Sequence, residues 1–187
     1  MFKSLKFLVI SSTLFSITAC QIDKPVEKED KGYLLQNKFD AAEAAQQILG
    51  EGTSTIKGNA FLRQKGGTVV TCAGSDVYLI PYTEYANERM NVIYGSTTKA
   101  VISLFRHVKF ANNDPAYFTY QKKSVCDSDG KFEFSGIKEG AYFVITSVSW
   151  VVPTKVGKGY YDKKVGGSLM HKVQINKDKT KNIVLTD

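Results

Sequence analysis

The sequence contains few of the residues on which most catalytic and metal sites depend. Among 187 residues there are only two histidines, three cysteines and one tryptophan. No Cys-x-x-Cys pair is present, and so few histidines argue against a zinc site or a dithiol redox motif. The Gly-x-Ser-x-Gly and His-Glu-x-x-His motifs and a phosphate-binding glycine loop are also missing. We therefore expect no enzyme activity, no metal and no cofactor.

Long hydrophobic runs are missing as well. The apolar stretch near the N-terminus, residues 7–17, has eleven residues, whereas a helix that crosses a bilayer needs about 20. Lys3 and Lys6 precede this stretch, and Ile17-Thr18-Ala19-Cys20 follows it. A basic start, a short apolar run and small residues before a cleavage site are typical of an export signal.

The tetrapeptide that ends at Cys20 resembles the lipobox of bacterial lipoproteins, with Ile17 in place of the usual leucine. The resemblance implies that residues 1–19 are a signal peptide and that lipid chains such as palmitate are attached to Cys20. Two or more acyl chains give stable membrane attachment. It also implies a location in the cell envelope, and Gln21 in place of an inner-membrane retention aspartate favours the outer membrane. The alternative is an ordinary secretory signal in which Cys20 is incidental.

The 168 residues that would remain after cleavage suit one domain with a tether. They carry 23 Lys and Arg against 18 Asp and Glu, a net charge of +5. The lysines are dispersed, which is typical of a solvated surface and does not indicate nucleic acid. We expect a polar tether over 20–38, a short helix over 39–52 that packs on the domain with Asn37 as its cap, and a domain over 53–187.

The two remaining cysteines form an even pair in an oxidising compartment. We therefore expect a disulfide between Cys72 and Cys126. Closing a loop of this length stabilises a fold by about 4 kcal/mol on the chain-entropy model. The alternative is two separate buried thiols.

Alternation of apolar and polar residues predicts β-strands over most of the domain. It is clearest over 131–135, where Phe132 and Phe134 are expected to point inward. Residues 76–81 and 141–152 are apolar on both faces, as internal strands are. About seven strands with short turns are typical of an antiparallel β-sandwich.

A helical insertion over about 82–115 interrupts this pattern. Apolar residues recur at helical spacing over 82–94 and again over 98–110, so two helices are expected there. Strand composition returns over 116–125.

The run Cys-Asp-Ser-Asp-Gly-Lys-Phe-Glu-Phe-Ser-Gly-Ile at 126–137, followed by Gly-Ala-Tyr-Phe-Val at 140–144, resembles the carboxypeptidase regulatory-like domain. That family has the transthyretin-like (prealbumin-like) fold, and the resemblance covers about 53–187 in the right order. It implies a mainly β, seven-stranded Greek-key sandwich and a non-catalytic module that supports, docks, or binds carbohydrate or protein. The insertion and the expected disulfide depart from the family pattern.

One candidate binding surface lies in residues 153–167, which are expected to form a long hairpin loop, and the other is the helical insertion, residues 82–110, because it is what this chain adds to the basic sandwich. Exposed tyrosines among lysines stack on sugars or contact partner proteins. The alternative is a solvated loop without a ligand. The candidate residues are Tyr160, Tyr161, Lys158 and Lys163.

Four further polar residues have structural interpretations. His107 is expected on the surface of the second helix, and His171 is expected to be a half-buried structural histidine. Asp127 and Asp129 resemble the start of a calcium loop, but the later ligands of such a loop are missing. Aspartate is also common in tight turns, so the metal hypothesis is the weaker one.

The leading functional hypothesis is an envelope lipoprotein that presents a non-catalytic β-sandwich for protein-partner binding or envelope assembly. The alternative is a glycan- or peptidoglycan-binding module, and a cryptic hydrolase is a third hypothesis. The expected partners are the membrane, through Cys20, an envelope protein and a glycan, with no nucleic acid.

Overall fold

The computed structural model describes residues 31–187. The expected signal peptide, the lipidation site at Cys20 and the first part of the tether lie outside the described residues. Within residues 31–187, every helix is too short or too polar to cross a membrane.

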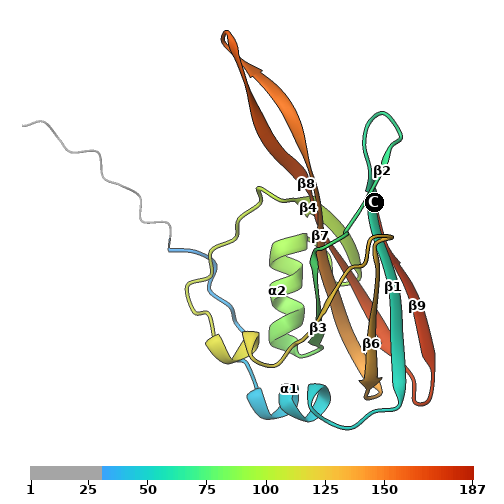
Figure 1. Cartoon of the computed structure of the whole chain (residues 1–187). Coiled ribbons are helices and arrows are strands. Elements are labelled where there is room, and N and C mark those ends of the chain that lie inside the picture. Colours follow the sequence, from blue (N-terminus) through green and yellow to red (C-terminus); the bar gives the residue numbers. More distant parts are fainter. Residues whose placement is uncertain (1–30) are drawn as a thin grey trace, which may run out of the picture. The chain divides into compact units, whose positions relative to one another are not determined.

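Two β-sheets pack face to face, and helices cover the outer face of the larger sheet (Figure 1). In the smaller sheet, β1 pairs antiparallel with β2 and β6 and parallel with β9. The larger sheet is antiparallel, with the order β4-β8-β7-β3-β5. The strands are β1 (Ser54–Arg63), β2 (Val69–Thr71), β3 (Asp76–Pro81), β4 (Lys99–Ser103), β5 (Lys122–Val125), β6 (Lys131–Ile137), β7 (Gly140–Val156), β8 (Gly159–Ile175) and β9 (Thr180–Leu185). The chain is therefore a mainly β sandwich, as the strand pattern predicted.

The main hydrophobic core lies between the two sheets. Phe132 and Phe134 of β6 are buried in it, as their alternation with polar residues predicted. Strands β3 and β7 are both internal, each hydrogen-bonded to two neighbours, which explains why they are apolar on both faces.

A second core lies between the outer face of the larger sheet and the helical layer. Helix α2 (Glu84–Tyr94) begins at Thr83, whose hydroxyl accepts the Ala86 N–H, and ends at Gly95 in the left-handed conformation with φ 69°. Its Met90 packs in the same cluster as Phe143 of β7. The layer also contains α1 (Ala41–Ile48) and the 3-10 turn η1 (Pro115–Phe118).

The cap of α1 differs from the prediction. Asp40 accepts the N–H groups of Ala42 and Glu43, whereas Asn37 donates to Glu88 of α2. The chain just before α1 is thus held against α2, and Leu35 is buried there.

The predicted second helix over 98–110 is wrong. Lys99–Ser103 is instead strand β4, which pairs with β8 at the edge of the larger sheet. Val101 and Ile102 are β-branched and suit a strand, and the edge of β8 satisfies their backbone hydrogen bonds. The insertion therefore adds a strand as well as a helix. The described residues contain nine strands, not seven, and the Greek-key order stays a prediction.

Two other strand boundaries also differ from the prediction. Only Lys122–Val125 of the segment 116–125 is a strand, because Asp114 caps the 3-10 turn and Pro115 occupies its first position. The segment 153–167 is not a loop. It continues β7 and β8, and the turn between them is confined to Gly157 and Lys158.

Candidate functional site

The predicted binding surface lies on a two-stranded ribbon. β7 and β8 pair with each other out to Val156 and Gly159, and across residues 150–165 no other described strand pairs with either of them. We call residues 150–165 the ribbon, which projects beyond both sheets (Figure 1).

The ribbon does not bring the two candidate tyrosines together. Tyr160 is 73% exposed and Tyr161 48% exposed, and as neighbours on a strand they point to opposite faces. Lys163 lies on the face of Tyr161, with its Nζ 5.6 Å from the centre of the Phe105 ring, while Lys158 lies in the turn. A single sugar ring cannot stack on both tyrosines.

The two histidines belong to different parts of the fold. His107 is exposed in the segment after β4 and not on a helix. His171 is half-buried in β8, in phase with the inward-facing Leu169 and Val173. Burial, and then the charge of Lys99, lower the pKa of the His171 imidazole. This placement agrees with a structural role for His171.

Asp127 and Asp129 hold a tight turn. Asp127 Oδ1 accepts the N–H groups of Asp129 (2.9 Å) and Lys131 (2.8 Å), and Asp129 forms an ion pair of 3.0 Å with Lys131. Over residues 31–187, no group of three or more His, Cys, Asp or Glu side chains is placed to hold a metal ion.

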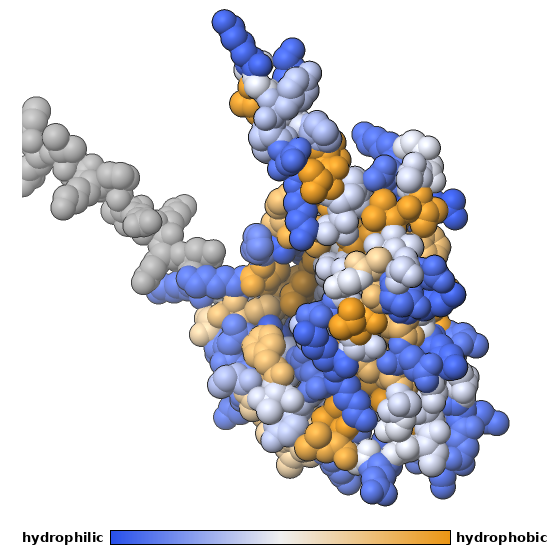
Figure 2. Space-filling view, viewed as in Figure 1, coloured by the Kyte–Doolittle hydropathy of each residue, from blue (hydrophilic) through white to orange (hydrophobic). Residues whose placement is uncertain are grey.

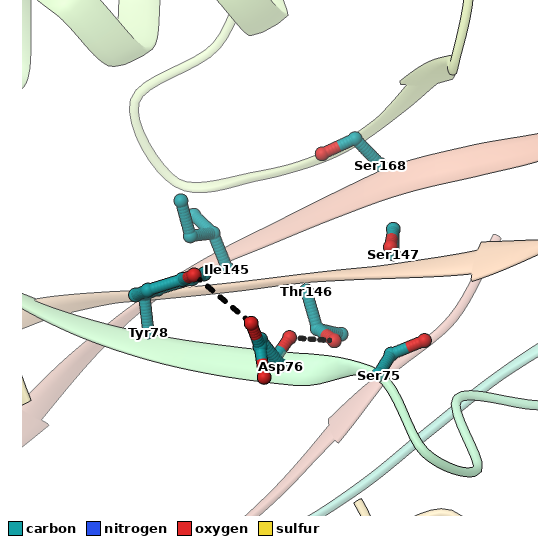
Figure 3. A pocket seen from close by; sticks show the side chains of 7 residues that line it. All are labelled: Ser75, Asp76, Tyr78, Ile145, Thr146, Ser147 and Ser168. Atoms are coloured by element: carbon teal, nitrogen blue, oxygen red, sulfur yellow. Dashed lines mark hydrogen bonds between the residues drawn. The ribbon is translucent and has the colours of Figure 1, made fainter. Parts of the chain in front are cut away.

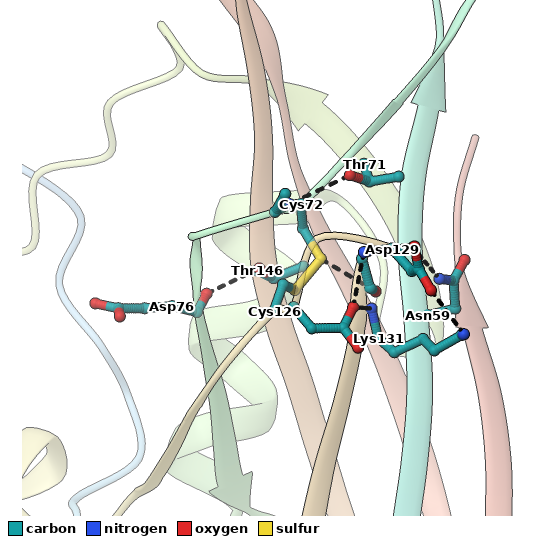
Figure 4. Close-up of a disulfide and its surroundings, with 11 residues drawn as sticks. Asn59, Thr71, Cys72, Asp76, Cys126, Asp129, Lys131 and Thr146 are labelled. Carbon is teal, nitrogen blue, oxygen red and sulfur yellow. Dashed lines mark hydrogen bonds and ion pairs between the residues drawn. A yellow bond between two sulfur atoms is a disulfide. The ribbon is translucent and has the colours of Figure 1, made fainter.

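The predicted disulfide between Cys72 and Cys126 is confirmed, with a Cα–Cα distance of 5.8 Å (Figure 4). It joins the chain after β2 to the chain after β5. The Cys126 N–H donates to the Ser75 carbonyl, and the Gly74 N–H donates to the Cys126 carbonyl. The bridge therefore holds the start of β3 in place.

A polar pocket begins beside this bridge, on the outer face of the larger sheet. We call it the sheet pocket, and its volume is about 320 Å³. Figure 3 shows Asp76 and Tyr78 from β3 on one side, with Ser147 and Ser168 from β7 and β8 on the other. Its lining residues are Ser75, Asp76, Tyr78, Ile145, Thr146, Ser147 and Ser168.

Hydrogen bonds and an ion pair organise the sheet pocket. Asp76 Oδ2 lies 2.8 Å from Lys123 Nζ and accepts the Tyr78 hydroxyl at 3.1 Å. The hydrogen bond from Lys123 is the main cause that lowers the pKa of the Asp76 carboxyl. Across the pocket, the Ser168 hydroxyl lies 2.8 Å from the hydroxyl of Tyr94, whose pKa is raised by burial.

A larger and more apolar pocket adjoins the sheet pocket, because Tyr78 and Ile145 line both. We call it the helix pocket, since it lies between α2, η1 and the sheet; its volume is about 510 Å³. Figure 2 shows a hollow with hydrophobic walls about where α2 lies in Figure 1. Its lining residues are Tyr78, Ile80, Arg89, Met90, Ile93, Tyr94, Tyr117, Phe118, Gln121 and Ile145.

Together the two pockets combine aromatic walls with a row of hydroxyl groups and one carboxylate. No histidine or cysteine lines either of them. Such a surface suits non-covalent binding of a ligand with both apolar faces and hydroxyl groups.

The predicted alternative surface, the insertion 82–110, contains Arg89 and Tyr94 of the helix pocket, but sequence reasoning did not single out the individual lining residues. One signal was available in the run 141–152: Ser147 and Ser149 place hydroxyls on one face of an otherwise apolar strand. Tyr78, in contrast, is an ordinary residue for an internal strand, and Arg89 has the pattern of a surface helix residue.

Comparison with known proteins identifies a fold but no family. No family model matches the sequence, and no curated protein sequence matches it. A crystal structure from Pseudomonas aeruginosa, described as a "putative carbohydrate binding protein", matches with a TM-score of 0.62 and 24% identity, over 81% of this chain and 99% of that one. At this identity the likeness shows the fold alone.

Two weaker likenesses carry no argument. They are a minor pilin of Streptococcus agalactiae (TM-score 0.31, 15% identity, 73% of this chain and 44% of that one) and a chlorocatechol 1,2-dioxygenase of Pseudomonas putida (TM-score 0.30, 12% identity, 88% and 70%).

Proposed function

We propose that this chain is a non-catalytic carbohydrate-binding protein of the cell envelope, anchored through Cys20, with its ligand in the sheet and helix pockets. The proposal depends most on Tyr78, whose ring lines both pockets. Sugars have apolar C–H faces and polar hydroxyl edges. An aromatic ring supplies the apolar surface, and a few fixed polar groups set the orientation.

The polar groups beside Tyr78 suit this task. Asp76 accepts hydrogen bonds, and Ser147 and Ser168 both donate and accept them. The Pseudomonas aeruginosa protein of similar fold is described as a "putative carbohydrate binding protein", which is compatible with this function. Neither pocket has a nucleophile beside an oriented base, so we propose binding without catalysis.

Glycan binding can be measured directly on the protein from residue 31 onward, which includes every described contact. We propose screening it on a glycan array and on purified peptidoglycan sacculi, followed by calorimetry. The Tyr78→Ala variant should bind about fivefold more weakly than the wild type, since stacking on an aromatic ring contributes about 1 kcal/mol.

The control is the double variant Tyr160→Ala/Tyr161→Ala on the ribbon, which should bind as the wild type does. Circular dichroism should show that both variants fold. If no glycan binds to the wild type, the proposal is wrong. If binding is lost in the ribbon variant and kept in Tyr78→Ala, the site is the ribbon and not the pockets.

A second candidate function is contact between the ribbon and an envelope protein. Val151, Val156 and Tyr160 are each more than half exposed there. The ribbon also carries lysines at 155, 158, 163 and 164 against the single acid Asp162, so the partner would present an acidic surface.

This second function is separable by mutation. Changing the four ribbon lysines to Glu should abolish crosslinking to a stoichiometric envelope protein, whereas Tyr78→Ala should keep it. Failure to recover such a protein from whole envelopes with the wild type would count against the ribbon as a docking surface.

A further inference from the structure

Arg89 is a buried cation without an acidic partner. Its side chain is on α2, it is 5% exposed, and it lines the helix pocket. The ion pairs in residues 31–187 do not include it. Buried charges in proteins are normally paired, because an isolated one is costly to desolvate.

The acids next in sequence to Arg89 and to its partner Asn113 are already engaged. The carboxylate of Glu88 accepts the backbone N–H groups of Gln36 (2.8 Å) and Asn37 (2.9 Å). The carboxylate of Asp114 accepts the Ala116 N–H at 2.9 Å. Within residues 31–187, neither forms an ion pair with the guanidinium.

The contacts that Arg89 does make leave it incompletely satisfied. Its Nη1 donates to the side-chain oxygen of Asn113. Its guanidinium is surrounded by four aromatic rings, whose centres lie at 4.2 Å (Phe110), 4.6 Å (Tyr117), 5.4 Å (Phe118) and 5.7 Å (Tyr85), and it also interacts with the Tyr117 hydroxyl. Aromatic faces stabilise a cation in part. Its Nε, however, is buried with no hydrogen-bond partner. An arginine offers donors in a fork that matches a carboxylate.

We infer that the helix pocket takes a saccharide that bears a carboxylate, such as a uronic, sialic or muramic acid, and that Arg89 recognises the carboxylate. The inference builds on the proposed function and specifies its ligand class. The sugar ring lies along Tyr78 and its hydroxyls face the sheet pocket. Gln121 supplies a further polar contact in the helix pocket.

The charged residues that line the two pockets are compatible with the binding of an anion. Asp76 is the only acid that lines either of them, and Lys123 neutralises it at 2.8 Å. Arg89 is the only basic residue that lines either pocket. A carboxylate bound there would gain a charge-assisted hydrogen bond that a neutral sugar cannot form.

The test on the wild-type protein uses matched pairs of saccharides. Uronic-acid, sialic-acid and muramic-acid saccharides are each compared with their own methyl esters by calorimetry. We expect at least one acid to bind ten or more times tighter than its ester. Equal affinity within every pair that binds would overturn the inference and leave the proposed function standing. Absence of binding by these saccharides and by the neutral glycans of the array would overturn both.

Variants connect the preference to Arg89. Arg89→Gln should reduce the acid-over-ester ratio to near one while binding of the ester persists, and Arg89→Lys should keep part of the preference. The matched control is Arg106→Gln, an exposed arginine whose side chain contacts the Val92 carbonyl at the end of α2. If Arg89→Gln folds and keeps the full preference for the acid, the carboxylate is recognised elsewhere and the inference is wrong.

Discussion

The ring of Phe132 in β6 lies directly against Gly58, its cross-strand partner in the neighbouring strand β1. A Cβ added at Gly58 would lie 2.0 Å from Phe132 Cζ. Phe132 belongs to the core between the sheets, and Gly58 is buried in β1. The Gly58→Ala substitution would force the ring to move within a close-packed core. We expect it to lower the free energy of unfolding by about 1–3 kcal/mol, measured by urea denaturation.

Gly66 provides the control for this substitution. It is exposed in the turn after β1, and nothing lies within 4 Å of a Cβ added there. Gly66→Ala should change stability by no more than about 0.5 kcal/mol. Equal effects of the two substitutions would contradict the packing of Phe132 against Gly58.

The same strands show which parts of the fold can be predicted from the sequence. Apolar and polar residues alternate around Phe132 and Phe134 because one face of the strand is buried. This pattern is contained within a few consecutive residues, so β6 could be predicted correctly. The prediction of a helix over 98–110 failed because a short apolar run fits both the helical spacing of 3.6 residues and the strand spacing of two. Lys99–Ser103 becomes a strand only because the edge of β8, about seventy residues later in the chain, is free to pair with it.

The candidate site was harder to predict, because it is built by tertiary contacts. Asp76, Arg89 and Ser168 come from β3, α2 and β8, and no local pattern relates them. The burial of Arg89 depends on Phe110 and Tyr117, which follow β4 in the chain. Residues 158–163 stood out because their composition is unusual, yet the strand geometry separates Tyr160 from Tyr161.

The disulfide should contribute substantially to stability. Cys72 and Cys126 are 54 residues apart, so the bridge restricts the unfolded chain by about 4 kcal/mol on the chain-entropy model. We expect the Cys72→Ser/Cys126→Ser variant to unfold at a lower urea concentration than the oxidised wild type. Reductant should lower the midpoint of the wild type and leave that of the variant unchanged. A wild type insensitive to reductant under conditions that break the bridge would contradict this role.

The anchor proposed at Cys20 makes a separate prediction. In bacteria that process lipoproteins, the full-length wild type should incorporate labelled palmitate and sediment with membranes. Cys20→Ser removes the only thiol that the lipobox resemblance assigns to acylation, so this variant should lose the label and become extractable without detergent. Cys72→Ser is the control, since it should keep the label. Unchanged labelling of Cys20→Ser would show that the segment is not a lipoprotein signal.

His171 should make stability depend on pH near neutrality. Its pKa in the folded state is lowered by burial, with further lowering from Lys99 and Lys181 that outweighs the opposing contact with the Val184 backbone. The unfolded state, with an ordinary histidine pKa of about 6.5, then binds a proton more readily than the folded state. Stability should therefore fall as the pH drops from 7 toward 5.

Urea midpoints at pH 7, 6 and 5 would measure this effect. His171→Gln cannot titrate in this range, so its midpoint should decline less than that of the wild type between pH 7 and 5. His107→Gln removes the exposed histidine after β4 and should decline as the wild type does. A steeper decline for His171→Gln than for the wild type would mean that protonation of His171 stabilises the fold, opposite to the direction that its burial between the sheets implies.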